Sequence, residues 1–458
     1  MENRRRILIV GRGTAGRALA SDVAERGNIV VGFLDDLSTN PDVLGTLEEV
    51  NSVIRSSAAE AVYFAIPSAD ARRVREFINA IEIDEVEVAI IPRTYQILTK
   101  EVVDIDDLTD VDVLDLVGRK PVKHDLVSST KFIEGKTILV TGAAGSIGSR
   151  LVEQLAAMSP AKLVCVDWWE NGMFFLQQAF ESRNDISFHI ADVKNAKVMD
   201  RIFAQYHPDV VFHAAAYKHV PLMQANPIEA VNNNVGGTQN VLALAGQYRA
   251  ANVVYVSTDK AVNPVNVMGA TKRLGELLLQ RTALEFPRTR FNAVRFGNVI
   301  QSNGSVMQIF RSQIARKSPL TVTHPDVTRF FMTIDEASQL IIQSAVIGRA
   351  SETFVLDMGE PVKILDLAKS LVRVVDPDLQ IEITGLRPGE KMFEELSYSP
   401  EDVDRTTNAK IFTVREQSST DDDELFERVD ELLAKSRDYV LTAQDAVAHL
   451  RSLGFAIK

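Results

Sequence analysis

The most constraining feature of the sequence is an apolar strand followed by a glycine-rich turn and a helix, between residues 137 and 158. The strand pattern TILV leads into TGAAGSIG, and the helix pattern SRLVEQLAAM follows. Gly142 and Gly145 permit a tight turn and close approach of the backbone to a ligand, and Gly148 permits close packing of the helix on the strand. The turn, which includes Ser146 and Ile147, therefore predicts a site for a dinucleotide pyrophosphate.

Further strands follow this turn, and helical segments separate them. Their carboxyl ends carry the remaining residues expected at a dinucleotide site: Asp167 after KLVCV, Asp192 and Val193 after ISFHIA, and Ala214, Ala215 and Ala216 after DVVFH. This succession predicts a doubly wound parallel sheet. Asp167 is placed to accept hydrogen bonds from an adenosine ribose, and an acid there disfavours a 2′-phosphate, so we expect NAD as the cofactor.

A similar pattern opens the chain. The strand pattern RILIV precedes GRGTAG, a helical pattern runs to Gly27, and the strand pattern IVVGFLDD ends at Asp35 and Asp36. Two more strand patterns, 61–67 and 86–92, flank an amphipathic helix pattern. Residues 1–95 therefore predict an N-terminal Rossmann-like domain. Its glycines suit either nucleotide binding or close helix packing, so a ligand site and a structural or regulatory role both stay open.

The rest of the chain divides by composition. Residues 96–134 are acidic and irregular, which predicts a linker. Residues 135–415 carry the second α/β domain, with a substrate lobe mainly at 295–400. Residues 416–458 predict an acidic linker followed by peripheral helices.

Composition excludes several classes of protein. Cys165 is the only cysteine and lies in a strand pattern, so we expect neither disulfides nor a cysteine-based metal site, and we expect no metal. A net charge of −12 argues against broad nucleic-acid binding. The sequence shows no signal peptide and no membrane span, which predicts a cytoplasmic protein.

Polar residues gather where the strand pattern 253–256 ends. Ser257, Thr258, Asp259 and Lys260 follow directly, and Lys272 adds a second amine. Ligands bind at the carboxyl ends of strands in open α/β sheets, so these groups suit proton chemistry. An ordinary polar loop is the alternative interpretation.

Several longer motifs carry a family resemblance: FHAAAYKHVPLMQANPIEAV, NNVGGTQNV, STDKAVNPVNVMGATKR, AVRFGNVIQSNGSV, THPDVTRFFMT, FVLDMGEPVKI and LRPGEK. With them, the region from about Lys136 to Leu396 resembles the extended short-chain dehydrogenase/reductases, and more narrowly the nucleotide-sugar 4,6-dehydratases of polysaccharide biosynthesis. The N-terminal part is similar to the Rossmann-like domain of large membrane-bound members, so the chain looks like a soluble counterpart. The resemblance also implies a homo-oligomer.

One position departs from most short-chain dehydrogenases, which place a proton-transferring Tyr four residues before the Lys. Here Met268 stands at that position and Lys272 is retained. A thioether cannot accept and return a proton. By resemblance, this substitution indicates a UDP-N-acetylglucosamine 4,6-dehydratase that retains configuration at C5. A C5-inverting dehydratase, a UDP-sugar 4-epimerase and a non-catalytic NAD-binding regulator of glycan assembly are the alternatives.

The resemblance also implies roles. The sugar is oxidised at C4 by NAD, water is lost across C5 and C6, and the hydride returns to C6. Asp259 protonates the leaving hydroxyl, Lys260 is the base at C5 and must be neutral, Thr258 hydrogen-bonds the C4 oxygen, and Lys272 holds the nicotinamide ribose. Two groups are candidates for removing the C4 hydroxyl proton: Asp259 directly, or Lys260 through a water.

Further residues are implied by position in the motifs. Asn234 belongs to the cofactor site, and the following belong to the UDP-sugar site: Lys218, His219, Asn298, Arg329, Arg387 and Glu390. Two guanidiniums suit a diphosphate. Arg329 and Arg387 as interdomain ion pairs, and His219 as a structural histidine, are the alternatives.

Overall fold

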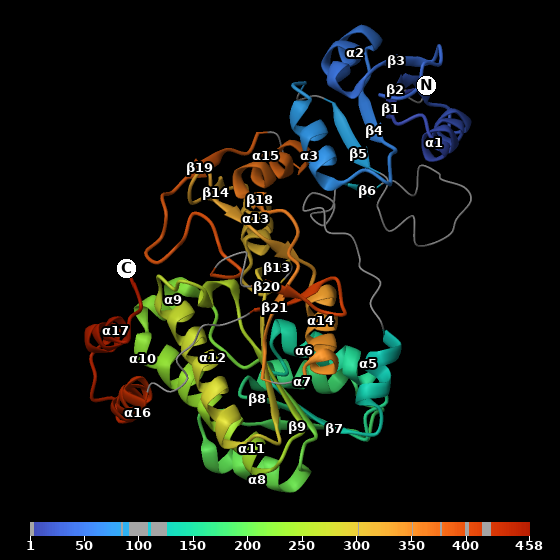
Figure 1. The fold of residues 1–458 in the computed structure, drawn as a ribbon. Helices are drawn as coiled ribbons and strands as arrows, with labels where there is room; N and C mark the ends of the chain where they lie inside the picture. Colours follow the sequence, from blue (N-terminus) through green and yellow to red (C-terminus); the bar gives the residue numbers. More distant parts are fainter. Residues whose placement is uncertain are drawn as a thin grey trace. The chain divides into compact units, whose positions relative to one another are not determined.

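The structure is a computed structural model that describes residues 4–83, 86–90, 109–110, 126–300, 302–349, 351–375, 378–398, 403–414 and 423–458. It divides into two compact units (Figure 1). The first comprises residues 1–121, 306–327 and 362–385, and the second comprises residues 122–305, 328–361 and 386–458.

The first unit contains the expected N-terminal sheet. Over the described residues its strand order is β3-β2-β1-β4-β5-β6, parallel except for β6. The strands are β1 (Arg6–Val10), β2 (Ile29–Leu34), β3 (Val43–Gly45), β4 (Ala61–Phe64), β5 (Glu87–Ile90) and β6 (Thr109–Asp110). The helices are α1 (Thr14–Glu25), η1 (Leu47–Glu49), α2 (Val50–Ser57) and α3 (Ala71–Ala80). The two strands predicted after IVVGFLDD correspond to β4 and to β5, whose predicted end at 91–92 lies outside the described residues.

Part of the segment expected as the substrate lobe groups with this first unit. Its elements are α13 (Val306–Ala315), β14 (Leu320–Val322), β18 (Val362–Lys363), α15 (Ile364–Val375) and β19 (Ile381–Ile383). Strand β14 pairs in parallel with β19. Helix α15 packs on α3, where the Ser370 hydroxyl donates a 3.1 Å hydrogen bond to Asn79 Oδ1.

The second unit is built on a larger sheet with the order β20-β21-β17-β12-β11-β10-β7-β8-β9 over the described residues. All its pairings are parallel except those of β21 with β17 and with β20. The strands are β7 (Thr137–Thr141), β8 (Lys162–Asp167), β9 (Ile186–Ile190), β10 (Val210–His213), β11 (Asn252–Val256), β12 (Arg290–Arg295), β17 (Thr353–Leu356), β20 (Val403–Arg405) and β21 (Ile411–Val414). The chain order reverses between β7 and β10, which is where doubly wound sheets bind ligands.

Helices cover both faces of this sheet. Along β7, Leu139 packs into one buried cluster with α8, α11 and α12, while Ile138 and Val140 pack into another with α6, α7 and α14. The helices are α5 (Leu126–Ile133), α6 (Ser146–Ala156), α7 (Glu170–Ala179), α8 (Ala196–Tyr206), α9 (Val220–Ala225), α10 (Pro227–Ala230), the π-helix η4 (Val231–Gly237), α11 (Thr238–Gln247), η5 (Asp259–Ala261), α12 (Val267–Glu285), α14 (Ile334–Ile347), α16 (Asp423–Arg437) and α17 (Ala443–Ser452). Three short strands complete the unit: β13 (Asn298–Val299), β15 (Thr328–Arg329) and β16 (Phe331–Met332). The doubly wound α/β fold expected from the sequence is confirmed.

The C-terminal helices, which we expected at the periphery, bury one apolar face in the second unit. Phe426 and Leu432 of α16 and Leu450 of α17 are buried in the same apolar cluster as the sheet residue Leu139. Their helical spacing is present in the sequence, but the many charges between them suggested a solvated surface. The linker predicted before these helices, at 415–422, lies outside the described residues.

Two stretches of the segment 96–134, which was predicted as a linker, form secondary structure: residues 109–110 and 126–133. Strand β6 pairs antiparallel with β5, and α5 buries Ile133 and packs on α14. The rest of the predicted linker lies outside the described residues. Within the described chain, no helix combines the length and apolarity needed to cross a lipid bilayer.

Candidate active site

The glycine turn after β7 packs closely against the backbone after β10 and against the start of α6. Gly142 has a φ of +68°, and a Cβ built on it would lie 2.6 Å from the amide nitrogen of Ala215. A Cβ on Gly148 would lie 1.9 Å from the carbonyl oxygen of Gly142. Gly145 is the N-cap of α6, and no side chain caps this helix. The turn therefore leaves backbone amides for an anion, as the spacing of its glycines predicts.

The neighbouring residues of the turn and Asp167 form one hydrogen-bonded unit. Asp167, 8% exposed at the end of β8, accepts hydrogen bonds from the backbone N–H groups of Ala144 and Trp169, each at 3.0 Å. Ser146 Oγ accepts a 3.0 Å hydrogen bond from the backbone N–H of Asn303. Ile147 packs against the buried cluster that contains Ile138 and Val140. The carboxylate thus supports the turn, and its contact with a ribose stays a prediction.

Asn234 and the Ala214–Ala216 segment lie on the opposite side of the turn. The Ala214 N–H donates to the Thr141 carbonyl at 3.1 Å. Asn234, fully buried in η4, accepts a hydrogen bond from the Tyr217 N–H at 2.8 Å and donates to Thr271 Oγ1 at 3.1 Å. Asn234 therefore joins the loop after β10 to α12.

Asp192 and Val193 flank the same π-helix. Asp192 Oδ1 accepts a 2.9 Å hydrogen bond from the backbone N–H of Lys194, and its carboxylate lies 3.5 Å from the Lys194 ammonium. Val193 is buried, and a Cβ on Gly237 would lie 2.6 Å from its Cγ2 atom. Close packing of η4 on Val193 therefore depends on Gly237.

Met268 and Lys272 lie one turn apart on α12, as their spacing predicts. Lys272 donates to the Val256 carbonyl, and its Nζ lies 4.0 Å from the centre of the Tyr255 ring. Burial lowers the pKa of Lys272 to about 7, although the charge of Glu276 opposes this shift. Met268 is 4% exposed and packs in the apolar cluster that contains Leu139.

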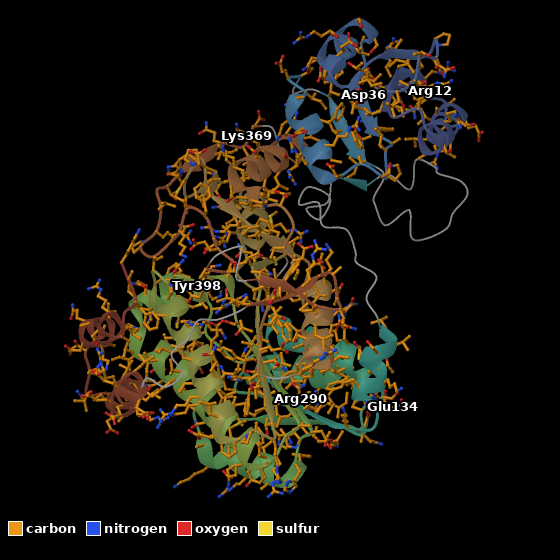
Figure 2. The ribbon with its side chains drawn as sticks, viewed as in Figure 1. Arg12, Asp36, Glu134, Arg290, Lys369 and Tyr398 are labelled. Atoms are coloured by element: carbon orange, nitrogen blue, oxygen red, sulfur yellow. The ribbon has the colours of Figure 1, made fainter. Side chains whose placement is uncertain are left out.

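Glu276 is the centre of a buried polar network that joins two strands to α12. It accepts hydrogen bonds from Ser257 after β11 at 2.6 Å and from Arg295 of β12 at 2.8 and 2.6 Å, and Arg273 reaches it at 2.9 Å. Burial alone would raise the pKa of Glu276, but the Arg295 and Arg273 guanidiniums and the Ser257 hydroxyl together outweigh it and hold the pKa low. Tyr398, labelled in Figure 2, lies 5.5 and 5.7 Å from the two guanidiniums.

The three residues after Ser257 contact one another directly. Asp259 Oδ1 accepts hydrogen bonds from the Thr258 hydroxyl at 2.8 Å and from the Lys260 ammonium at 3.0 Å. Lys260 also donates to Asn298 Oδ1 at 3.2 Å. Asp259 is fully buried, and its Oδ2 atom has no hydrogen-bond partner among the described residues.

Arg329 and two glutamates extend this cluster. Arg329 pairs with Glu390 at 2.9 Å and lies 3.9 Å from Glu394, which is 3.6 Å from the Lys260 ammonium. These ion pairs lie within the second unit. In the described part of the chain, no group of three or more His, Cys, Asp or Glu residues could hold a metal ion.

The polysaccharide biosynthesis protein family matches residues 138–416, more than half of the chain. The chain belongs to this family. A CoA-binding domain family matches residues 1–92.

Relatives of this family member include proteins named for polysaccharide biosynthesis and proteins named as UDP-glucose 4-epimerases. The capsular polysaccharide biosynthesis protein CapD of Staphylococcus aureus is 40% identical over 407 residues, which are 85% of this chain and 68% of CapD. The UDP-glucose 4-epimerase of Rickettsia canadensis is 38% identical over 274 residues, 58% of this chain and 79% of the epimerase.

Solved structures agree with the α/β fold over more than half of the chain. Pen from Bacillus thuringiensis has a TM-score of 0.59 and 33% identity, over 62% of this chain and 91% of Pen. The dTDP-glucose 4,6-dehydratase DesIV from Streptomyces venezuelae, solved with NAD and TYD bound, has a TM-score of 0.53 and 23% identity, over 57% of this chain and 88% of DesIV. The DesIV likeness shows a shared fold.

Three other residues expected at the site of this polysaccharide biosynthesis protein, Lys218, His219 and Arg387, are exposed to solvent. The His219 ring lies against Gly304, where a Cβ would be 2.4 Å from its Cε1. Arg387 donates its backbone N–H to Glu390 Oε2 at 3.1 Å. Their contacts with a substrate stay predictions.

The structure differs from the sequence interpretation at two points of the cluster. Lys260 was expected to be neutral. Burial does lower its pKa, but the carboxylates of Asp259 and Glu394 outweigh burial and raise the pKa above its ordinary value. Glu394 was not identified at all. The available signal was the acidic pair in KMFEELS, but nothing in the sequence separates the buried Glu394 from Glu395, which pairs with Lys391.

Proposed function

We propose that this protein dehydrates UDP-N-acetylglucosamine to a UDP-4-keto-6-deoxy-N-acetylhexosamine, with NAD as cofactor and with retention at C5. Membership of the polysaccharide biosynthesis family supports sugar-nucleotide chemistry. The observation that carries the proposal is the direct contact, at 3.0 Å, between the buried Asp259 carboxylate and the Lys260 ammonium at the end of β11. An acid and a potential base in contact suit an elimination that needs both.

The residues of the turn fit NAD. Gly142 and Gly148 allow close backbone packing that a side chain would prevent, α6 begins without a capping side chain, and Asp167 is at the end of the next strand. NAD, when bound, supplies reversible oxidation at the sugar C4. We assign Gly142, Gly145, Ser146 and Ile147 to its pyrophosphate, Asp167 to its adenosine ribose and Lys272 to its nicotinamide ribose.

The residues of the cluster supply the proton chemistry. A C4 ketone makes the C5 proton acidic, so a base near C5 and an acid near the C6 hydroxyl complete the elimination. We assign the base to Lys260 and the acid to Asp259, with Thr258 bonded to the C4 oxygen. Asn298, Arg329, Arg387, Glu390, Lys218 and His219 are assigned to the UDP-sugar.

A UDP-sugar 4-epimerase is the second candidate, because the Rickettsia relative carries that name. An epimerase of this superfamily is expected to need the Tyr that Met268 replaces. The buried thioether at position 268 can neither take nor return a proton, so the dehydratase is favoured.

The test is incubation of the purified protein with UDP-N-acetylglucosamine and, separately, with UDP-glucose, followed by mass spectrometry and by proton NMR, which distinguishes a 4-epimer from the substrate. Loss of one water from the N-acetylated substrate supports the proposal, and a weaker reaction with UDP-glucose supports the N-acetyl preference. An isomer of unchanged mass identifies an epimerase, and unchanged substrate contradicts both enzymes.

A further inference from the structure

The Lys260 ammonium lies between two buried carboxylates. Its Nζ is 3.0 Å from Asp259 Oδ1 and 3.6 Å from Glu394 Oε1, and the two acidic side chains are 1% and 4% exposed. The second oxygen of each carboxylate, Asp259 Oδ2 and Glu394 Oε2, is buried without a hydrogen-bond partner among the described residues. A buried carboxylate oxygen without a donor is a suitable position for a proton.

Lys260 and Arg329 lie among three carboxylates, those of Asp259, Glu390 and Glu394. The proposed function requires Asp259 to supply the proton for the leaving hydroxyl, which leaves Glu394 as the second carboxylate beside Lys260. Arg329 then pairs with Glu390, and Lys260 pairs with Glu394.

From this arrangement we infer that Glu394 is a positioning residue that acts through Lys260: it holds the ammonium and accepts its proton, which leaves the amine free to act as base. The inference rests on the proposed function and adds a residue to it. It also resolves how a lysine held as a cation between carboxylates becomes a base.

The proton transfers balance. Lys260 gives a proton to Glu394, and the neutral amine takes the proton from C5. The electrons of the C5–H bond form the C5–C6 double bond while the C6–O bond breaks, and Asp259 protonates the departing oxygen to give water. When the hydride returns to C6, Lys260 gives a proton to C5, and Glu394 then returns its proton to Lys260. The proton that the C4 hydroxyl loses on oxidation restores Asp259, so every protein group ends as it began.

The test uses the full chain with Glu394→Gln, which keeps the size of the side chain but cannot accept the proton. With UDP-N-acetylglucosamine in deuterated water, we expect the absorbance of reduced nicotinamide to appear as in the wild type. Deuterium incorporation at C5 should fall by roughly 100-fold, the usual scale of lost acid–base catalysis. Glu394→Asp should recover part of the exchange.

A second readout needs no turnover. NMR titration of isotope-labelled lysine should show a lower pKa for Lys260 in Glu394→Gln, because a neighbouring negative charge has been removed. Glu395→Gln is the matched control, since Glu395 is half-exposed and pairs with Lys391. It should change neither readout.

The outcomes separate the two ideas. A wild-type protein that leaves the substrate unchanged contradicts the proposed function. An active wild type whose Glu394→Gln variant exchanges C5 at the wild-type rate, or whose Lys260 pKa does not move, overturns the role of Glu394. A variant that no longer folds is replaced by Glu394→Asp, which must then show a slower exchange for the inference to stand.

Discussion

The carboxylate of Glu276 accepts two hydrogen bonds from the guanidinium of Arg295, at 2.8 and 2.6 Å, and neither side chain is exposed to solvent. The pair joins β12 to α12, the helix that carries Lys272. Through Ser257, it also holds the end of β11, directly before Thr258. A single buried ion pair thus fixes the positions of both proposed halves of the site.

We expect Glu276→Gln to lower the free energy of unfolding by about 3–5 kcal/mol, because it leaves the buried Arg295 charge without its partner. Urea unfolding measures this change. Glu431→Gln removes an exposed partner of Lys435 and should cost at most ~1 kcal/mol. A loss at position 276 no larger than that of the control would contradict the structural role of the pair.

His213 predicts a specific acid sensitivity. It is fully buried between Thr141 and Thr238, and burial lowers its pKa to about 3, from 6.5. Between about pH 3 and 6.5, His213 is therefore protonated in the unfolded state but neutral in the folded state. The free energy of unfolding rises with pH across this range and falls on acidification through it.

The measurement is the free energy of unfolding at pH 7 and pH 5. His213→Asn should lose about 2 kcal/mol less than the wild type over this interval, since its titration is absent. His207→Asn, at an exposed left-handed position that Asn tolerates, is the control and should keep the wild-type dependence. Parallel curves for wild type and His213→Asn would show that His213 is not held neutral.

Lys260→Ala should separate oxidation from elimination. If Lys260 takes the C5 proton only after C4 has been oxidised, the variant should still reduce bound NAD on mixing with substrate and yet form no product. Rapid-mixing absorbance and product analysis test this together. Turnover near the wild-type rate would reject Lys260 as the base.

Met268→Leu should keep the reaction. The side chain is buried in the apolar cluster, and a swap of similar volume costs less than about 1.5 kcal/mol. We expect turnover close to that of the wild type, whereas Lys272→Met on the same helix should impair it. A strong loss of activity in Met268→Leu with unchanged stability would show that the thioether contributes to the chemistry.

The parallel strands of the second unit were predictable from sequence because they are short and apolar. Several of them are followed by glycine or by polar residues of the kind that bind ligands. Gly142, Asp167 and the Thr258–Lys260 segment were found in this way, and the fold around them is confirmed. The burial of α16 was not predicted, since the charges between Phe426 and Leu432 obscured its apolar face.

The candidate site was harder to predict where it depends on contacts between distant segments. Glu394 reaches Lys260 from a position 134 residues later in the chain, and an adjacent Glu395 has the same local sequence environment. The charge state of Lys260 was missed for the same reason, because it depends on this long-range contact. Oligomeric state and cellular location stay predictions.

The most direct test of the central claim is proton NMR of the reaction with UDP-N-acetylglucosamine in deuterated water. The account predicts a 4-keto-6-deoxy product that carries deuterium at C5 in the original configuration. A 4-epimer with a protonated C5 would contradict the account, and a deuterated product inverted at C5 would contradict the expected retention.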